Sequence, residues 1–317
     1  NEPQEDEVRI QVKALGLNQA EAMLREGRYV ASPNFPSRIG IEASGIVDAI
    51  GSNVSSCKIG DSVCAIPFLS WDENDYWTAD SINKYGVYGD TAIVPAWTIS
   101  KKVSNQSFEE AAAAWCQYLT AWGGLVYNSN IEKRSCCIFT GASSSAAIGG
   151  MQIVKSFWPQ AFAISRTLEK KDTLINIGYD EILALDNPNL EENIMDLTNG
   201  IGFDLAYDCV GGEYFINLVN TAKAQGLIVN YGNLNQNSSD IRTLPLLSKR
   251  LNIRFHSIFD TMRFDNQRNE GINWVNTKME EGILKPIISK VFNLDDIVEA
   301  HKYLAEGNQI GKTVVVT

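Results

Sequence analysis

The sequence predicts an α/β protein in which a doubly wound parallel sheet is combined with a mostly β region. Three observations support this prediction. From residue 135 to about 232, short apolar runs alternate with segments of helical composition. From residue 8 to about 102, short β-type runs are broken by Gly, Pro and Asn. The chain has 317 residues, a length at which a single core begins to divide, so two domains are expected.

The first region, assigned to residues 1–106, contains four predicted strands, at 8–14, 43–50, 61–66 and 91–95. A helix is expected to start at Ser107, because Ser107 and Glu110 have the spacing of a capping box. The apolar stretch 111–127 is interrupted by Gln117, Thr120 and two glycines, and it is shorter than the ~20 residues of a membrane span. We therefore interpret it as a buried helix and expect no membrane association.

The alternating region, assigned to residues 107–250, has the composition of a Rossmann-type domain. Short apolar strands with helices between them are typical of a parallel sheet that is buried on both faces. The predicted strands are 136–140, 161–165, 181–185, 205–209 and 227–231, and the predicted helices are 146–157, 169–177 and 214–223. The remaining residues, 251–317, predict helices at 269–281 and 294–305 and a last strand at 312–316, which we expect to rejoin the first domain.

Composition excludes several classes of function. Lys and Arg number 27 against 38 Asp and Glu, so the formal net charge of −11 disfavours nucleic acid as a partner. The acidic start of the sequence has no apolar core of a signal peptide. The six cysteines form no CxxC pair, which favours reduced thiols in a cytoplasmic protein without structural zinc.

The first strand of the alternating region runs into a turn of small residues, which continues through Ser143, Ser144, Ser145 and Ala146. Small residues at such a turn let the backbone approach a pyrophosphate, with helix N–H groups facing it. The strict GxGxxG pattern is absent, although serine hydroxyls can also donate to phosphate oxygens. The alternative is a turn that is small only for packing; its place on the first strand of a parallel sheet favours phosphate binding.

The second strand ends at Ser165 and is followed by Arg166 and Lys170. An NAD-specific fold would place an acid here for the ribose 2′-hydroxyl. A hydroxyl, an Arg and a Lys instead suit a 2′-phosphate, so the sequence predicts NADPH as the cofactor. The alternative is a solvated basic start of a helix.

Several segments together resemble the zinc-independent quinone oxidoreductase and enoyl reductase branch of the medium-chain dehydrogenase/reductases. The resemblance spans nearly the whole chain and is specific as a set. The segments that carry it are 16–18 with 28–29, 40–47 followed by 54 and 60–63, 118–121, 208–212, 231–232 and 311–312.

This resemblance implies a GroES-like fold for the first domain and a nicotinamide that lies in a cleft near Asn18 and Thr120. Asn18 and Tyr29 are then the catalytic candidates, with Tyr29 within reach of a substrate carbonyl. Tyr29 either donates a hydrogen bond or proton, or is a wall residue while solvent supplies the proton. The other residues that the resemblance assigns to the cofactor are Val210, Tyr231, Gly232, Phe259 and Lys312.

The chain departs from the family in two ways. Ala147 replaces a usual glycine and could crowd the pyrophosphate, and the opening strands expected before residue 1 are missing. The missing strands suggest either disorder or a domain cut from a longer polypeptide. The Cys and His that hold the metal in zinc-dependent relatives are matched here by Asn18 and Ile41, so no catalytic metal is expected.

The sequence thus predicts a metal-free, NADPH-dependent reductase that delivers hydride to an activated C=C bond, as in an enoyl thioester or enone, or to a quinone. One alternative is an enoyl reductase domain of a polyketide synthase with a carrier-tethered acyl substrate, and another is an NADPH-binding protein without turnover. The aromatic segment 68–88 is either a loop that faces the substrate or an insertion that packs on its own surface. By analogy with the family, edge strands near 254–259 could pair in a homodimer.

Overall fold

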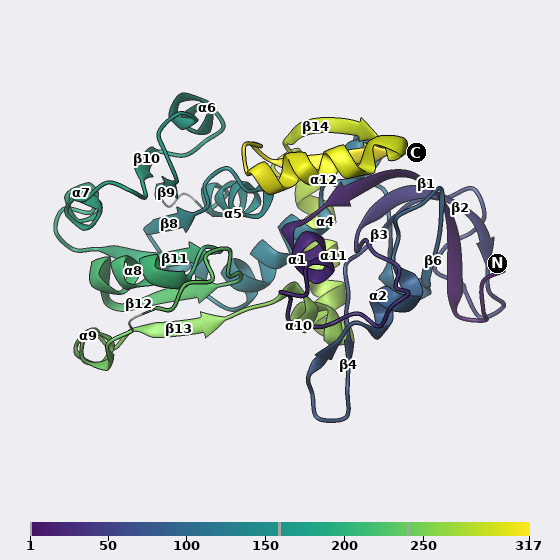
Figure 1. Cartoon of the computed structure of the whole chain (residues 1–317), viewed down its shortest axis with the longest axis horizontal. Helices are drawn as coiled ribbons and strands as arrows, with labels where there is room; N and C mark the ends of the chain where they lie inside the picture. The colour runs from purple at the N-terminus through teal and green to yellow at the C-terminus, as the bar shows by residue number, and fades with distance from the viewer. Residues whose placement is uncertain (1, 158–159, 240) are drawn as a thin grey trace. The chain divides into compact units, whose positions relative to one another are not determined.

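The computed structural model describes residues 2–157, 160–239 and 241–317, and the chain divides into two compact units (Figure 1). The first unit consists of Asn1–Cys116 together with Ile258–Thr317, and the second of Gln117–Ser257. The predicted α/β class with two domains is confirmed, and so is the return of the C-terminal segment to the first domain.

The first unit is built on a seven-stranded, largely antiparallel sheet. Its strand order is β14-β15-β1-β2-β3-β7, and β6 pairs with the first half of β1. The bounds are β1 Glu7–Leu17, β2 Ala43–Ile50, β3 Ser62–Ala65, β6 Thr91–Pro95, β7 Ile99–Lys101, β14 Ile288–Asn293 and β15 Lys312–Val316. The four strands predicted in residues 8–95 and the last strand, 312–316, are all present.

The long strand β1 holds this sheet together because it pairs with three other strands. Its residues Glu7–Gln11 pair with β6, and its residues Ala14–Leu17 pair with β15. Every second residue in this part of β1, namely Val8, Ile10 and Val12, points into one apolar core. This core also contains residues of β2, β3, β6 and helix α12 (Ile297–Glu306), as expected for a strand with one buried face. The C-terminal strand therefore completes a core that the N-terminal strands begin.

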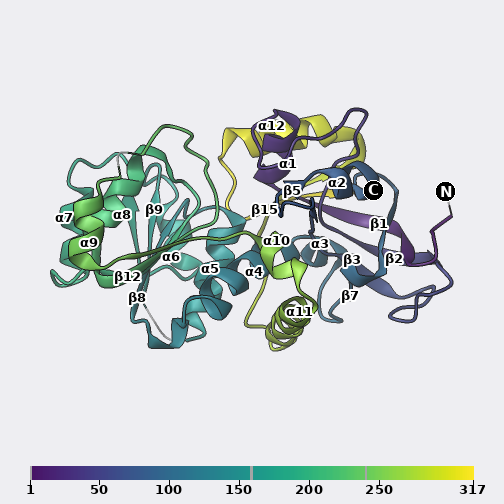
Figure 2. The ribbon, with the colours of Figure 1, turned by 90° about the horizontal axis from the view of Figure 1, so that it is seen from below.

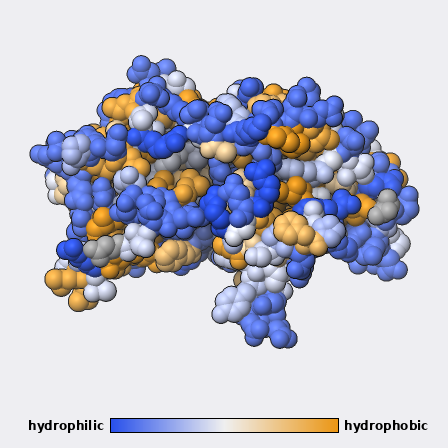
Figure 3. Space-filling view, in the orientation of Figure 1, coloured by the Kyte–Doolittle hydropathy of each residue, from blue (hydrophilic) through white to orange (hydrophobic). Residues whose placement is uncertain are grey.

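Two further groups of elements complete the first unit. A hairpin of β4 (Ser70–Trp71) and β5 (Trp77–Thr78) carries the acidic tip of the aromatic segment, which projects in Figure 1 and is hydrophilic in Figure 3. The helices are α1 Gln19–Arg25, α2 Asp80–Tyr85, α3 Phe108–Ala112, α10 Ile258–Arg263 and α11 Asp265–Glu280, with one-turn 3-10 segments η1 Ala96–Thr98 and η5 Leu294–Asp296.

Helix α3 shows why the domain boundary expected after residue 106 needs correction. The predicted capping box is present: Ser107 Oγ accepts from the Glu110 N–H at 3.1 Å, and Glu110 accepts from the Ser107 N–H at 2.9 Å. The helix packs its apolar side on β1 and β15, in a cluster that includes Ala112 and Val314. Since α3 is covered by the first sheet, the first unit extends to Cys116, within α4 (Trp115–Ala121).

The second unit contains a six-stranded parallel sheet in the order β10-β9-β8-β11-β12-β13. The chain winds outward from β8 through β9 to β10, then returns to the other side of β8 and continues through β11, β12 and β13. This is a doubly wound sheet with a topological switch point between β8 and β11. The strands are β8 Cys136–Thr140, β9 Gln160–Ser165, β10 Glu181–Ala184, β11 Phe203–Asp208, β12 Ala222–Asn230 and β13 Asn252–Phe255.

Helices cover both faces of this sheet (Figure 2). On one face, Ile138, Phe162 and Ile228 pack against Leu190, Leu218 and other apolar residues of α7, α8 and α9. On the other face, Gly150 of α5 approaches Phe139 and Tyr207 closely. The helices are α5 Ser145–Lys155, α6 Lys171–Asn176, α7 Leu190–Leu197, α8 Phe215–Thr221 and α9 Thr243–Lys249, together with a π-helical segment η2 Trp122–Tyr127 and 3-10 segments η3 Ile131–Lys133 and η4 Gly212–Tyr214.

The second boundary also differs from the expected one. Residues 251–257 were assigned to the tail, but β13 pairs in parallel with β12, from Leu227 opposite Asn252 to Asn230 opposite Phe255. These residues therefore belong to the Rossmann-type sheet, and the second unit ends at Ser257. Among the described residues, no helix is long and apolar enough to cross a membrane.

Candidate active site

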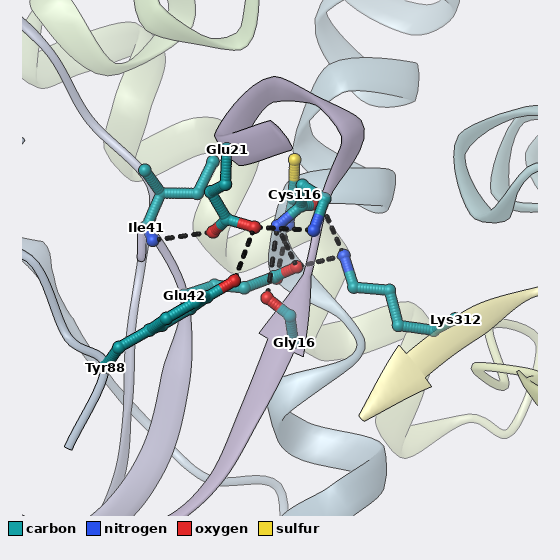
Figure 4. Close-up of polar contacts among 8 residues, drawn as sticks. Gly16, Glu21, Ile41, Glu42, Tyr88, Cys116 and Lys312 are labelled. Atoms are coloured by element: carbon teal, nitrogen blue, oxygen red, sulfur yellow. Dashed lines mark hydrogen bonds and ion pairs between the residues drawn. The ribbon is translucent and has the colours of Figure 1, made fainter. Parts of the chain in front are cut away.

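The first unit contains a buried cluster of polar side chains around the start of α1 (Figure 4). Asn18, Glu21, Glu42 and Lys312 come from the end of β1, from α1, from the segment before β2 and from β15. Glu42 and Lys312 are 0% and 1% exposed, and the Lys312 ammonium group pairs directly with the Glu42 carboxylate. Burial alone would lower the pKa of Lys312, but the Glu42 carboxylate outweighs this effect and the pKa is raised. Lys312 is therefore a buried, permanently charged group.

The side chain of Asn18 makes three hydrogen bonds within the first unit. Its Nδ2 donates to Glu42 Oε1 at 3.0 Å and to the Gly16 carbonyl oxygen at 3.2 Å, and its Oδ1 accepts from Lys312 Nζ at 2.5 Å. An amide has two N–H donors and one oxygen with two lone pairs. Both donors are thus used within the protein, and only one acceptor position on Oδ1 remains for a ligand.

Glu21 lies in the same cluster and completes a second capping box. Its carboxylate accepts from the Asn18 N–H at 2.6 Å, the Ile41 N–H at 2.9 Å and the Tyr88 hydroxyl at 3.0 Å. Burial raises the pKa of Glu21 to about 7, although the hydrogen bond from the Asn18 N–H and the charge of Lys312 oppose this rise. The charge of Glu21 therefore changes near neutral pH.

Tyr29, the predicted catalytic phenol, follows α1 and is half-buried. Burial raises its pKa, and the negative charge of Glu21 contributes in the same direction. The phenol therefore keeps its proton at neutral pH. Tyr29 can donate a hydrogen bond, and its high pKa makes full proton transfer slow.

In the second unit, the turn after β8 has the geometry expected of a phosphate site. Gly141 has φ +61°, where a side chain would be strained, and a Cβ there would lie 2.6 Å from Cys209 Sγ. Ser144 caps α5, since its Oγ accepts from the Ala147 N–H at 3.2 Å. Ser143, Ser145 and Ala146 are half-buried at the carboxyl edge of the sheet.

A second turn, after β11, lies next to the first because β8 and β11 are neighbours at the switch point. The buried Asp208 carboxylate accepts from the Thr140 hydroxyl at 2.5 Å, from Asn230 Nδ2 at 2.8 Å, and from the backbone N–H groups of Val210 and Gly211. This carboxylate ties the ends of β8, β11 and β12 together. Dinucleotides bind at such a switch point in open α/β sheets.

The predicted 2′-phosphate residues lie at the end of β9. Ser165 is buried, Arg166 is exposed and Lys170 is half-buried. Lys170 Nζ contacts Ser143 Oγ at 3.5 Å, so it reaches back to the turn after β8. Burial and then the charge of Arg166 lower the pKa of Lys170. The two cations therefore repel one another, and an anion between them would be stabilised.

Four predicted cofactor residues have specific positions in the second unit. Val210 follows β11, and Tyr231 and Gly232 follow β12, so all three lie at the same carboxyl edge as Ser143 and Arg166. Thr120 is in α4, and its carbonyl oxygen accepts from His256 Nε2 at 2.9 Å. His256 comes directly after β13, and burial lowers its pKa to about 4, so the ring is neutral at pH 7.

Phe259, also predicted to contact the cofactor, is not part of the second unit. It belongs to α10 of the first unit, is buried, and makes an edge-to-face contact with Trp77 at 6.3 Å. Arg263 of the same helix pairs with Asp75 and lies 5.4 Å from the Trp71 ring, so α10 anchors the hairpin of the aromatic segment. The hairpin thus packs on α10 of its own unit, and both interpretations of the aromatic segment stay predictions.

Ala147 is completely buried, and its N–H is already bonded to Ser144. The close approach of helix and sheet falls instead at Gly150, where a Cβ would lie 2.9 Å from Phe139. Among the described residues, no group of three or more His, Cys, Asp or Glu side chains is placed to hold a metal. All six cysteines are free, and five of them are buried.

Sequence reasoning assigned no site role to Glu21, Tyr88 or His256, which the structure shows bonded to one another or to the predicted site residues Asn18 and Thr120. The spacing of Asn18 and Glu21 is that of a capping box, which would have pointed to Glu21. Tyr88 and His256 carry no such local signal, because each is brought to its partner by tertiary packing.

Comparisons with known proteins agree with this geometry. Residues 4–104 match the model of the alcohol dehydrogenase GroES-like domain, and residues 177–315 match a model described as zinc-binding dehydrogenase. The human protein quinone oxidoreductase is 23% identical over 99% of this chain and 90% of its own length.

Two solved structures are similar over the whole chain and 93% of their own length. One is an NAD-dependent alcohol dehydrogenase, at 27% identity and a TM-score of 0.87. The other is a quinone oxidoreductase of Escherichia coli complexed with NADPH, at 22% identity and a TM-score of 0.88. One of these proteins depends on NAD and the other is complexed with NADPH, so the choice of cofactor has to be argued from the residues of this chain.

Proposed function

We propose, from the premise that this chain belongs to the medium-chain dehydrogenase/reductases of the quinone oxidoreductase type, that it is a reductase specific for NADPH. It transfers hydride to a quinone or to an activated C=C bond, and it does so without a metal. The oxidoreductase class comes from the family; the cofactor, the acceptor and the absence of a metal are our proposals.

The pair of cations behind β9 carries the cofactor assignment. Arg166 offers a planar fork for a phosphate, and Lys170 adds a point charge whose pKa is lowered by burial and then by the charge of Arg166. Ser165, between them and the sheet, offers a hydroxyl and no carboxylate. A 2′-phosphate relieves the repulsion between the cations, whereas the bare ribose hydroxyl of NADH does not.

The other residues at the carboxyl edge fit the remainder of the cofactor. The serine turn Ser143–Ser145 and the start of α5 would hold the pyrophosphate, and Val210, Tyr231 and Gly232 would line the path from it. When bound, NADPH supplies the hydride. Asn18, with one acceptor position left on Oδ1, suits contact with an N–H group of the cofactor better than donation to a substrate oxygen.

The metal-free assignment depends on the residues that replace metal ligands. Ile41 has no atom in its side chain that could bind a metal, and the Asn18 amide already bonds to Glu42, Gly16 and Lys312, with a single acceptor position left on Oδ1. The developing charge on the substrate must therefore be stabilised by hydrogen bonds. Tyr29 keeps its proton at neutral pH and can donate one such bond. The proton that completes the reduction comes either from Tyr29 or from solvent.

An NADPH-binding protein without turnover is the second candidate. The observation that favours it is that both N–H donors of Asn18 are used within the protein. It predicts tight NADPH binding but no oxidation of NADPH by any acceptor.

The decisive assay follows the loss of NADPH absorbance with a simple quinone and, in parallel, with a short enoyl thioester. Turnover of the quinone alone supports a free-standing quinone reductase, and turnover of the thioester alone supports an enoyl reductase with an acyl substrate. Binding of NADPH without either turnover supports the second candidate.

The cofactor assignment has its own test. Arg166→Ala is expected to weaken NADPH binding at least tenfold and to leave NADH binding unchanged. Lys171→Ala is the matched control, because Lys171 pairs with Glu181 and its removal changes the net charge equally. Equal affinity of the wild-type protein for NADPH and NADH, unchanged in Arg166→Ala, would show that the 2′-phosphate assignment is wrong.

A further inference from the structure

The buried cluster of the first unit carries an unbalanced charge. The Lys312 ammonium group pairs with the Glu42 carboxylate, whereas the groups that bond to Glu21 are neutral donors: two backbone N–H groups and the Tyr88 hydroxyl. One cation thus faces two carboxylates when Glu21 is ionised. The cluster then has a net charge of −1, and it is neutral when Glu21 is protonated.

The groups that pack around this cluster from other elements do not cancel the charge. Tyr88 remains protonated, since burial raises its pKa well above the usual value. His301 of α12 lies 5.8 Å from the Tyr88 ring, and burial lowers its pKa, so it is neutral at pH 7. Arg25, at the end of α1, is exposed to solvent, where its field is screened.

Glu21 contacts Asn18, and it would act on a ligand through its charge and not through a contact. Its carboxylate holds the Asn18 N–H at 2.6 Å, while the Asn18 side chain is held by Glu42 and Lys312. The position of Asn18 therefore depends on both carboxylates. Under the proposed function, Asn18 lies next to the nicotinamide, whose ring gains a positive charge as the hydride leaves.

We propose, on the basis of the proposed function, that Glu21 is a positioning residue for hydride transfer: its carboxylate fixes the backbone of Asn18 and supplies the negative charge that favours the oxidised, positively charged nicotinamide. A fixed charge in a water-excluded site acts on developing charge without reorganisation. The effect is strongest above neutral pH, because burial raises the pKa of Glu21 to about 7 and the residue is ionised only above that range.

Binding measurements test the charge without any acceptor. We expect the wild-type protein to favour NADP⁺ over NADPH increasingly as the pH rises from 6 to 8.5. In Glu21→Gln, the ratio of the NADPH dissociation constant to the NADP⁺ dissociation constant should not change with pH. At pH 8.5, the preference of this variant for NADP⁺ should be about fivefold weaker than that of wild type. Isothermal titration calorimetry with both nucleotides gives the ratio directly.

Turnover gives the second readout. For the wild-type enzyme, kcat should rise through about pH 7. In Glu21→Gln it should be about tenfold lower at pH 8.5 and independent of pH, with the KM of the acceptor within a factor of about two. Glu21→Asp should restore part of the pH dependence. Tyr88→Phe removes one donor to the carboxylate and should shift the midpoint to higher pH without abolishing it.

The controls separate this inference from the function on which it rests. Glu270→Gln, an exposed acid of α11, changes the net charge equally and should behave as wild type. Failure of NADPH to bind to the wild-type protein would overturn the proposed function. If NADPH binds but Glu21→Gln leaves the ratio of the NADP⁺ and NADPH dissociation constants unchanged, the inference alone is overturned. A kcat that falls as the pH rises through 7 in wild type, but not in Glu21→Gln, would overturn it as well, because Glu21 would then be a proton donor.

Discussion

Lys312 is the only ammonium group in the buried cluster of Asn18, Glu21, Glu42 and Lys312, and three oxygen-bearing side chains depend on it. We expect Lys312→Met to lower the free energy of unfolding by about 3–5 kcal/mol, because it leaves the Glu42 carboxylate buried without a counter-charge, with only the neutral donors Asn18 Nδ2 and the Cys116 N–H. Urea denaturation measures the change. Lys302→Met, which breaks an exposed pair with Glu299, should cost less than about 1 kcal/mol.

The double variant Lys312→Met with Glu42→Gln distinguishes an uncompensated charge from lost packing. If the charge dominates, the double variant is more stable than Lys312→Met alone. A double variant that is less stable by the sum of both changes would contradict this explanation, since it would show that the two residues contribute independently.

Glu21 also predicts how stability depends on pH. Its pKa is about 7 in the folded protein against 4.5 as the reference value, so the folded state binds the proton more tightly than the unfolded state. The resulting stabilisation is fully present below pH 4.5 and is lost as the pH rises through 7. We expect the difference in unfolding free energy between wild type and Glu21→Gln to fall by at most about 3 kcal/mol over this window.

The same measurement on His256 should show the opposite sign. Burial lowers its pKa to about 4, so its contribution is present above pH 6.5 and is lost as the pH falls through 4. The two groups offset one another in the wild-type protein between pH 4.5 and 6.5. The two contributions are separated by comparing wild type with a variant of each residue in turn. A difference in unfolding free energy between wild type and variant that stays constant across the pH window would contradict the pKa shift assigned to that residue.

At the scale of elements, the packing of α5 on the sheet depends on Gly150. A Cβ there would lie 2.9 Å from Phe139 and 3.1 Å from Tyr207, both of which are completely buried. Alanine favours a helix by about 1 kcal/mol over glycine. We nevertheless expect Gly150→Ala to destabilise the protein by about 1–3 kcal/mol, because neither ring can move without disturbing the core.

Gly149→Ala is the matched comparison for this helix. Its nearest contacts, at 3.2 Å and 3.3 Å, are with the single side chain of Tyr118, which has to give by only a few tenths of an ångström. Its effect on the melting temperature should be smaller than that of Gly150→Ala. If the two substitutions lower the melting temperature equally, the loss of stability comes from the helix itself and not from its packing on Phe139 and Tyr207.

The elements of this chain were predictable where local signals and burial agree. The strands that end at Thr140 and Ser165 are short apolar runs in a sheet buried on both faces, and the start of α3 carries a complete capping box. The strand β13 was expected only by analogy with the family, near 254–259, and not from its own residues, because all of them but Ile253 are exposed and the strand lacks an apolar signal. Its place in the sheet comes from backbone pairing with β12, which sequence patterns do not report.

The candidate site was predictable to a different degree in each unit. At the carboxyl edge of the parallel sheet, topology alone brings Ser143, Arg166 and Val210 together once the strands are known. In the first unit, Lys312 lies 294 residues from Asn18, and no local pattern predicts that the two side chains meet. The engagement of both Asn18 donors therefore became visible only in the structure.

At the scale of the whole molecule, β13 leaves an unpaired edge of the parallel sheet. Phe255 on this strand is 75% exposed, and Leu244 and Leu247 of the neighbouring helix α9 are 73% and 75% exposed. Figure 3 shows hydrophobic residues at the end of the second unit where α9 lies. An unprotected edge with apolar residues beside it favours pairing with another strand.

We predict that this edge pairs with its copy in a twofold homodimer, which joins two six-stranded sheets. Each protomer carries a formal charge of −11, so the protomers repel one another and association should become tighter as salt is added. Phe255→Glu should abolish the dimer in sedimentation equilibrium. Phe35→Glu, at an equally exposed phenylalanine of the first unit, should leave it intact. A wild-type protein that stays monomeric at high salt and about 100 µM would contradict the prediction, because an edge of this kind should bury enough area for a stable interface.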